Sequence, residues 1–84
     1  GLVTEVCEPD ALSVRASELA AELASKAPIA VAGILDAVVV GGVKSLEEGL
    51  QHEYAALERA ITSADMQEGV MSFLQKRTPV FKGK

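Results

Sequence analysis

Apolar side chains recur at intervals of three and four positions along most of the chain, which is the period of an amphipathic helix. The pattern predicts four helices, at about residues 11–26, 28–40, 46–61 and 64–76. Pro28 and the Gly41–Gly42 pair separate the first three segments, and Thr62 and Ser63 are expected to end the third helix and cap the fourth. The expected fold class is therefore all-α, with a single helical domain over residues 1–84.

The two ends of the chain have other patterns. Residues 2–6 (LVTEV) predict one short strand before the helices, and residues 78–84 predict an extended tail because Thr78 precedes a proline. A lone strand is not a stable sheet, so the remaining strands are expected elsewhere. The chain also begins without methionine, and both features favour a segment of a longer protein.

Capping residues mark where helices begin. Asp10 is expected to cap the first helix, and Ser45 with Glu48 forms a capping box for the third. The fourth helix is expected to begin with Asp65 and Glu68 in its first turn, where the helix dipole favours acids.

Each helix is expected to bury an apolar face. The second helix is apolar nearly all round and is therefore expected to be buried on several sides. On the third and fourth helices the expected buried residues are Leu46, Leu50, Tyr54, Leu57, Ile61, Met66, Val70, Phe73 and Leu74.

Charge is unevenly distributed. The net charge of −4 argues against non-specific binding to nucleic acid. All twelve acidic residues lie within residues 1–75, whereas the last nine residues hold four basic side chains and no acid. Such a tail suits a phosphate or an acidic partner, but charge alone favours an ordinary helix end, whose dipole attracts cations. The apolar second helix is too short for a membrane span, so no membrane partner is expected.

No pattern of residues indicates a metal or a catalytic site. His52 has no neighbouring ligand and is expected on a helix surface. Asp36 stands alone in an apolar segment, which favours exposure or a hydrogen bond between helices. Cys7 is the only cysteine, so no internal disulfide forms. A solvated helix face accounts for Glu47, Glu48, Glu53 and Glu58.

One stretch carries a more specific pattern. Residues 65–83 (DMQEGVMSFLQKRTPVFKG) resemble the C-terminus of crotonase-superfamily proteins, the enoyl-CoA hydratases and isomerases, which reads D-x-x-E-G-x-x-A-F-x-E-K-R-x-P-x-F-x-G. The spacing holds throughout, with Ser72 and Gln75 in place of Ala and Glu. Residues 1–6 resemble the family's G-L-V-x-x-V strand, and residues 27–28 its K-A-P junction. The resemblance covers the whole chain and implies the helical C-terminal region of a crotonase-type fold.

The resemblance implies a parent enzyme that acts on acyl-CoA thioesters, with coenzyme A as part of the substrate and no covalently bound cofactor. The family's oxyanion hole and catalytic glutamates lie upstream of the matched region, so no catalytic residue is expected here. Family members form trimers, often paired as hexamers, and a dimer or trimer is expected for this segment alone. Hydratase, isomerase and other crotonase reactions remain open, and a cytoplasmic location is expected, or the mitochondrial matrix in a eukaryote.

The resemblance also implies contacts with coenzyme A. In similar trimers a lysine of the K-R pair reaches the CoA phosphates of a neighbouring subunit, and that position is Lys76. Phe73 lies one turn earlier, and an aromatic residue is usual at the position of Leu57 or Ile61, where aliphatic residues keep an apolar wall. Core packing is the ordinary alternative for Phe73, Leu57 and Ile61. For the whole chain, the alternative is a free-standing helical protein–protein interaction module.

Overall fold

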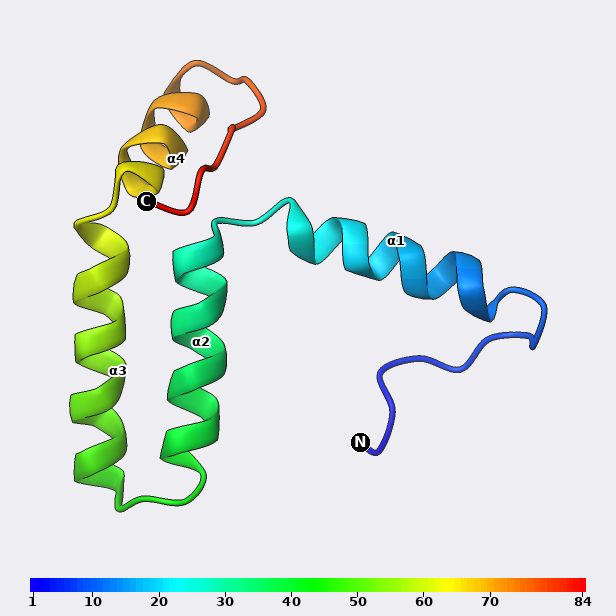
Figure 1. Cartoon of the computed structure of the whole chain (residues 1–84), viewed down its shortest axis with the longest axis horizontal. Helices are drawn as coiled ribbons and strands as arrows, with labels where there is room; N and C mark the ends of the chain where they lie inside the picture. The colour runs from blue at the N-terminus through cyan, green and yellow to red at the C-terminus, as the bar shows by residue number, and fades with distance from the viewer.

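The computed structural model describes residues 1–84 and contains four α-helices and no strand (Figure 1). The helices are α1 (Leu12–Ala24), α2 (Pro28–Gly41), α3 (Leu46–Ile61) and α4 (Ala64–Leu74). The four predicted helices are confirmed, although α1 and α4 both end short of the predicted residues 26 and 76. Pro28 begins α2 as expected, since the first turn of a helix needs no N–H at that position.

The predicted strand at residues 2–6 is wrong for this chain. The segment is irregular and lies apart from α2 and α3 (Figure 1). A strand satisfies its backbone N–H and C=O groups through a neighbouring strand, and residues 1–84 contain none. The segment is tied instead to α1, because Arg15 donates hydrogen bonds of 2.9 and 2.8 Å to the carboxylate of Glu5.

α2 and α3 run antiparallel and form the main packed unit of the molecule (Figure 1). Small residues line their seam. A methyl group added to the buried Gly33 would lie 3.4 Å from the Cβ of Ala56, and one added to Gly49 would lie 3.3 Å from the Cα of Gly41. Residues without large side chains allow this close approach of the two backbones.

The predicted apolar stripes are exposed, because no helix is covered on more than one side and α1 is covered on none. On α3 the face toward α2 carries Gly49, His52 and Ala56 instead of the predicted leucines. The expected burial of α2 on several sides is also wrong in this chain. Its large residues Ile34, Leu35, Val38 and Val39 are 62–69% exposed.

The helix caps follow the sequence in two of three cases. The Ser45–Glu48 capping box is confirmed, since each residue accepts a hydrogen bond from the backbone N–H of the other, at 3.3 and 3.1 Å. Ser63 accepts the N–H of Met66 at 3.1 Å and so caps α4. Asp10 does not cap α1, whose N-cap is Ala11. The chain is already turned there by a hydrogen bond from the Ala11 N–H to the Glu8 carbonyl, so the helix begins one residue later.

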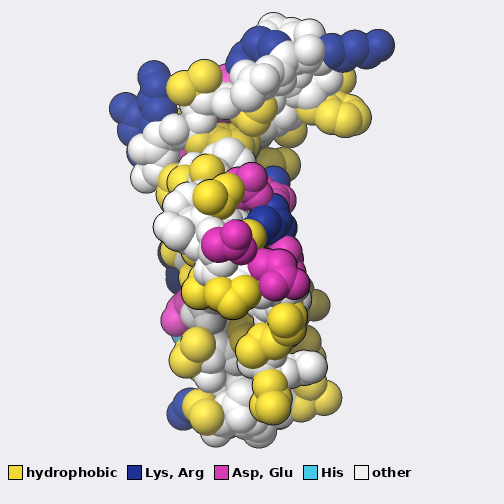
Figure 2. Space-filling view, turned by 90° about the vertical axis from the view of Figure 1, so that its right-hand side faces the viewer, with side chains coloured by type: hydrophobic (Ala, Val, Ile, Leu, Met, Phe, Trp, Pro, Cys, Tyr) yellow, Lys and Arg dark blue, Asp and Glu magenta, His cyan; other side chains and the backbone are white.

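α1 points away from the antiparallel pair of α2 and α3, which we call the hairpin, and it buries none of its residues (Figure 1). Glu22 and Lys26, four residues apart, form an ion pair at 3.5 Å, but it is exposed and local. No single helix is long and apolar enough to cross a bilayer, and α1 and α2 reach that length only together, across a bend of 106°. Figure 2 shows many apolar side chains uncovered on the side of the molecule that α1 occupies.

Candidate functional site

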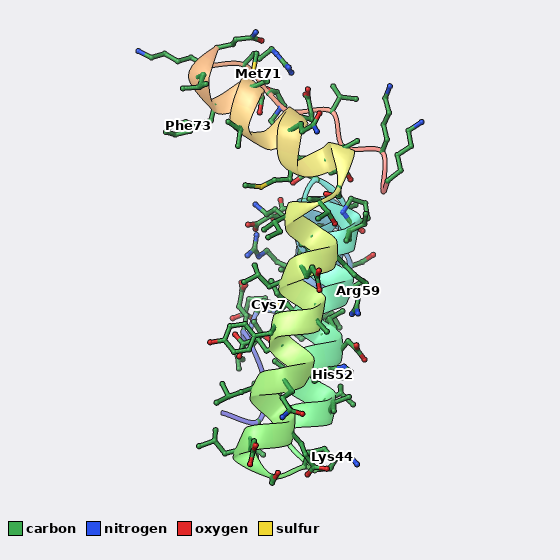
Figure 3. All side chains as sticks on the ribbon, turned by 90° about the vertical axis from the view of Figure 1, so that its left-hand side faces the viewer. Cys7, Lys44, His52, Arg59, Met71 and Phe73 are labelled. Carbon is green, nitrogen blue, oxygen red and sulfur yellow. The ribbon has the colours of Figure 1, made fainter.

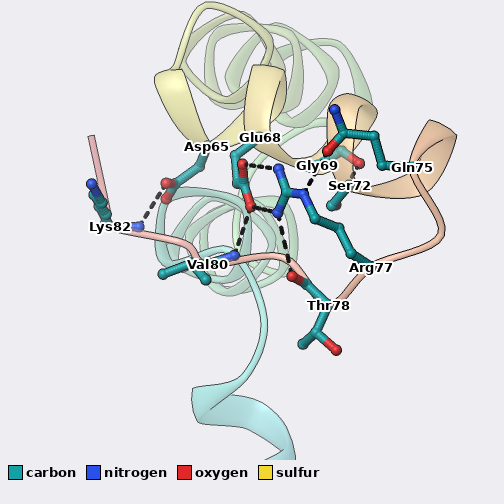
Figure 4. Close-up of polar contacts among 9 residues, drawn as sticks. All are labelled: Asp65, Glu68, Gly69, Ser72, Gln75, Arg77, Thr78, Val80 and Lys82. Atoms are coloured by element: carbon teal, nitrogen blue, oxygen red, sulfur yellow. Dashed lines mark hydrogen bonds and ion pairs between the residues drawn. The ribbon is translucent and has the colours of Figure 1, made fainter.

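α4 and the tail that follows it fold onto each other through carboxylate hydrogen bonds (Figure 4). Asp65 is only 3% exposed, and its two oxygens accept the backbone N–H groups of Lys82 and Gly83, both at 2.7 Å. The N–H of Asp65 in turn donates to the carbonyl of Lys84 at 3.1 Å. The tail therefore returns along α4 to the start of α2, where Gly83 lies near Pro28.

Glu68 holds the tail at a second point, one turn along α4 (Figure 4). Arg77 donates two parallel hydrogen bonds to its carboxylate, at 2.5 and 2.8 Å, and the N–H of Val80 donates a third at 2.8 Å. The guanidinium and then the Val80 N–H lower the pKa of Glu68 from 4.5 to about 2. We call the bonds made by Asp65, Glu68 and Arg77 the C-terminal latch.

The turn after α4 holds Lys76 in the left-handed region, at φ 52°, the only non-glycine residue there. The N–H of Arg77 donates to the carbonyl of Ser72 and the N–H of Lys76 to that of Phe73, at 3.0 and 3.2 Å. This pair of bonds is the Schellman motif, in which glycine usually occupies the position of Lys76. Lysine costs about 1 kcal/mol there relative to glycine. The cost favours a use for the Lys76 side chain that glycine cannot supply.

Phe73 and Lys76 are both open to solvent at the end of α4. Phe73 is 82% exposed and points away from the helices (Figure 3), so its predicted burial is wrong in this chain. Lys76 takes part in none of the salt bridges of the chain. Both side chains are therefore available to another molecule.

An apolar hollow of about 550 Å³ lies between the start of α2, the end of α3 and α4. It brings together three of the four residues singled out from the sequence, Leu57, Ile61 and Phe73, whereas Lys76 is not part of its wall. Phe81 from the tail completes the hollow near Gly69. The structure thus separates the predicted residues into an apolar wall and a cation outside it.

Asp36 and His52 connect α2 to α3 on another face. The Nε2 atom of His52 lies 2.7 Å from Oδ2 of Asp36, and Nη2 of Arg59 lies 3.7 Å from the same oxygen. The predicted hydrogen bond of Asp36 between helices is confirmed. His52 and Arg59 lie on the opposite side of the molecule from Phe73 (Figure 3), so this polar group belongs to the hairpin and not to the hollow.

Comparison with known proteins bears on the family and on the helical fold. The family model Enoyl-CoA hydratase/isomerase matches residues 1–84. The chain belongs to the enoyl-CoA hydratase/isomerase family. Its four helices are the helical segment of the crotonase fold. A crystal structure of an enoyl-CoA hydratase/isomerase from Mycobacterium paratuberculosis superposes with a TM-score of 0.92 at 34% identity, over 100% of this chain and 33% of that one.

Two curated members of the family have defined substrates in their names. The chain is 35% identical to the (E)-benzylidenesuccinyl-CoA hydratase of Thauera aromatica, over 99% of this chain and 32% of that protein. It is 34% identical to the 2,3-dehydroadipyl-CoA hydratase of Escherichia coli K12, over 100% and 33%. The chain spans about a third of the length of the curated relatives it matches.

Sequence reasoning missed the latch of this enoyl-CoA hydratase/isomerase family member. Asp65 and Glu68 were expected only as acids that suit a helix start, and Arg77 only as part of a basic end. A signal was present in the motif itself. Two acids one turn apart are followed by Pro79, which cannot continue a helix, and the tail beyond it is long enough to return to them.

Proposed function

We propose that this chain supplies coenzyme A contacts and subunit contacts to an enzyme that acts on acyl-CoA thioesters. One observation carries the proposal: an exposed aromatic ring, Phe73, and an unpaired cation, Lys76, lie at the same end of α4 beside an apolar hollow. Coenzyme A carries an adenine ring and several phosphates. An apolar wall suits the ring, and a lysine suits the phosphates.

Lys76 acts in this proposal as a point charge toward phosphate. The left-handed backbone at Lys76 supports this role, because the conformation is less favourable for lysine than for glycine and the lysine side chain forms no ion pair within the chain. Phe73, Leu57 and Ile61 supply the wall against which the adenine ring lies. The aliphatic residues at 57 and 61 offer contact area without aromatic stacking.

The subunit contacts rest on the exposed apolar faces of α1 and α2. An α-helix as apolar as α2 is ordinarily covered on more than one side, and in this chain α3 covers one. Uncovered apolar faces of this kind mark interfaces between subunits or domains. A homo-oligomer of the enzyme, trimeric or built from trimers, would cover them.

The acyl group is left to other parts of the enzyme. The two hydratases named above have different acyl groups, yet they match this chain at 35% and 34% identity. A region shared at similar identity by enzymes for different acyl groups supports a role toward their common part, which is coenzyme A.

The test is the Lys76→Ala variant of the full-length enzyme. One exposed charge contact is worth roughly 0.5–1.5 kcal/mol, so the KM for acyl-CoA should rise by a few-fold to about tenfold at low salt. The rise should shrink at high salt, because exposed charges are screened. The kcat should change little, since Lys76 holds the nucleotide and not the reacting carbons.

Lys76→Arg is the matched control, because it keeps the charge and should retain most of the binding. An unchanged KM for Lys76→Ala at low salt, together with a lower melting temperature, would contradict the proposal. Lys76 would then be a structural residue at a subunit contact.

A further inference from the structure

The turn that carries Lys76 is held on both sides by side chains (Figure 4). On one side, Arg77 makes the two parallel hydrogen bonds to Glu68. On the other, the Nε of Arg77 donates to the side-chain oxygen of Gln75 at 2.7 Å. Lys76 lies between two residues whose side chains are bonded to each other, and one of them is anchored to α4.

This arrangement restricts the backbone at Lys76. A residue in the left-handed region returns readily to more favourable conformations unless its surroundings hold it there. The Schellman bonds alone depend on the ordering of residues 75–77, and the bonds of Arg77 to Glu68 and Gln75 supply that order. The direction in which the Lys76 side chain leaves the backbone is therefore set by Glu68, Gln75 and Arg77.

We propose that Glu68, Arg77 and Gln75 form a positioning clamp that presents the Lys76 ammonium to the phosphates of the acyl-CoA substrate. The inference rests on the proposed function of Lys76. It assigns the positioning of Lys76 to Glu68, Arg77 and Gln75, which do not touch the substrate. A preorganised cation loses less conformational freedom on binding than a mobile one. Loosening the clamp therefore weakens binding even though the charge of Lys76 remains.

The experiment compares Glu68→Gln, Lys76→Ala and the double variant in the full-length enzyme. Glu68→Gln is expected to raise the KM for acyl-CoA by about two- to fivefold with kcat unchanged, since it disrupts the paired bonds to Arg77. The double variant is expected to match Lys76→Ala alone, because the clamp acts only through Lys76. Glu47→Gln is the matched control: it removes the same charge from an exposed residue at the start of α3 and should leave KM unchanged.

The same acyl group carried on pantetheine, which lacks the nucleotide and its phosphates, gives a second readout. Neither Glu68→Gln nor Lys76→Ala is expected to alter the KM for this substrate. An equal rise with the pantetheine thioester would show a general distortion of the enzyme and would overturn the clamp.

The outcomes also separate the two proposals. If Lys76→Ala raises KM while Glu68→Gln leaves it unchanged, or if the two effects simply add, the clamp is wrong and the role of Lys76 stands. If Lys76→Ala leaves KM unchanged, both fall. Should Glu68→Gln fail to fold, Gln75→Ala replaces it, because this variant keeps the Glu68–Arg77 pair. An unchanged KM for Gln75→Ala would then refute the clamp.

Discussion

The two ends of the molecule use the same element, a short amphipathic helix, with opposite results. α1 has a regular apolar stripe and buries none of its residues, whereas α4 buries Asp65 and Ser72 and has its own tail folded back along it (Figure 1). The difference lies in where the partners are. The carboxylates of Asp65 and Glu68 accept hydrogen bonds from N–H groups and a guanidinium that lie within 18 residues along the chain. The apolar stripe of α1 has no partner within residues 1–84.

The comparison shows that an apolar stripe predicts a helix without predicting what covers it. Hydrophobic contact has no direction, so any apolar surface of suitable shape serves. Paired hydrogen bonds to a carboxylate depend on geometry, and at Glu68 the bonds donated by Arg77 and Val80 meet that condition locally. The C-terminal latch is therefore complete within the chain, whereas the outer faces of α1 and α2 need another surface.

The largest expected effect concerns those uncovered faces. The 84-residue chain should form a dimer or trimer at high micromolar concentration, because apolar faces of this size associate. Introducing charge with Leu19→Lys and Val38→Lys should give a monomer, since both side chains are exposed on these faces. Val80→Lys, at a residue that is 65% exposed but lies in the latched tail, is the control and should leave the assembly unchanged. Analytical ultracentrifugation that finds the unmodified chain monomeric would refute the expectation.

The next effect concerns the latch at its most buried residue. Asp65→Ala removes the acceptor for the N–H groups of Lys82 and Gly83 and should lower the free energy of unfolding by about 3 kcal/mol. Urea denaturation measures the loss, and faster amide exchange at residues 82 and 83 locates it. Asp10→Ala removes an acid near α1 that caps nothing and should change stability by less than about 0.5 kcal/mol. Equal effects of the two substitutions would show that the latch does not hold the tail.

Acid should break the part of the latch that Glu68 forms. Because folding lowers the pKa of Glu68 from 4.5 to about 2, the ionised carboxylate stabilises the latch fully above about pH 4.5. This contribution should be lost as the pH falls from 4.5 toward 2. Amide exchange at Val80 against pH would report the opening, and Glu68→Gln should abolish that part of the pH dependence. A profile that is the same in both proteins would contradict the assignment.

The smallest effect distinguishes the cost of the positive φ at Lys76, which changes stability, from the role of its charge, which changes KM. Lys76→Gly should raise the free energy of unfolding by about 0.5–1 kcal/mol, because glycine adopts a positive φ without strain. The same variant of the full-length enzyme should show a KM for acyl-CoA raised as in Lys76→Ala. Lys44→Gly, at a position without positive φ, is the control and should lower stability slightly. A Lys76→Gly protein that is less stable would show that the lysine side chain itself supports the fold.

Much of the fold was predictable from local signals. The starts of α2, α3 and α4, at Pro28, Ser45 and Ser63, depend on residues within one turn. The sequence therefore contains what is needed to place them. The buried faces were not predictable in the same way. The hydrophobic pattern pointed to Leu50 and Leu57 on α3, but the contact with α2 is made through Gly49 and Ala56.

The candidate site likewise has features that the sequence predicted and features that it did not. Lys76 and Phe73 were identified from the motif, and their exposure at one helix end is a result of the structure. The positive φ of Lys76 was not foreseen, because lysine rarely occupies the position that glycine favours after a helix. The clamp of Glu68, Arg77 and Gln75 depends on the tail turning back, which no local propensity predicts.

The sequence by itself determined the four helices, most of their boundaries and the family to which the chain belongs, because these depend on periodicity, caps and a motif read in order along the chain. The tertiary structure alone decided which faces meet. Small residues at 33, 49 and 56 allow the backbones of α2 and α3 to approach closely, while the larger apolar residues remain outside. It also decided that Asp65 and Glu68 bind the tail, because a carboxylate acquires its partners only when the chain brings them within hydrogen-bond distance.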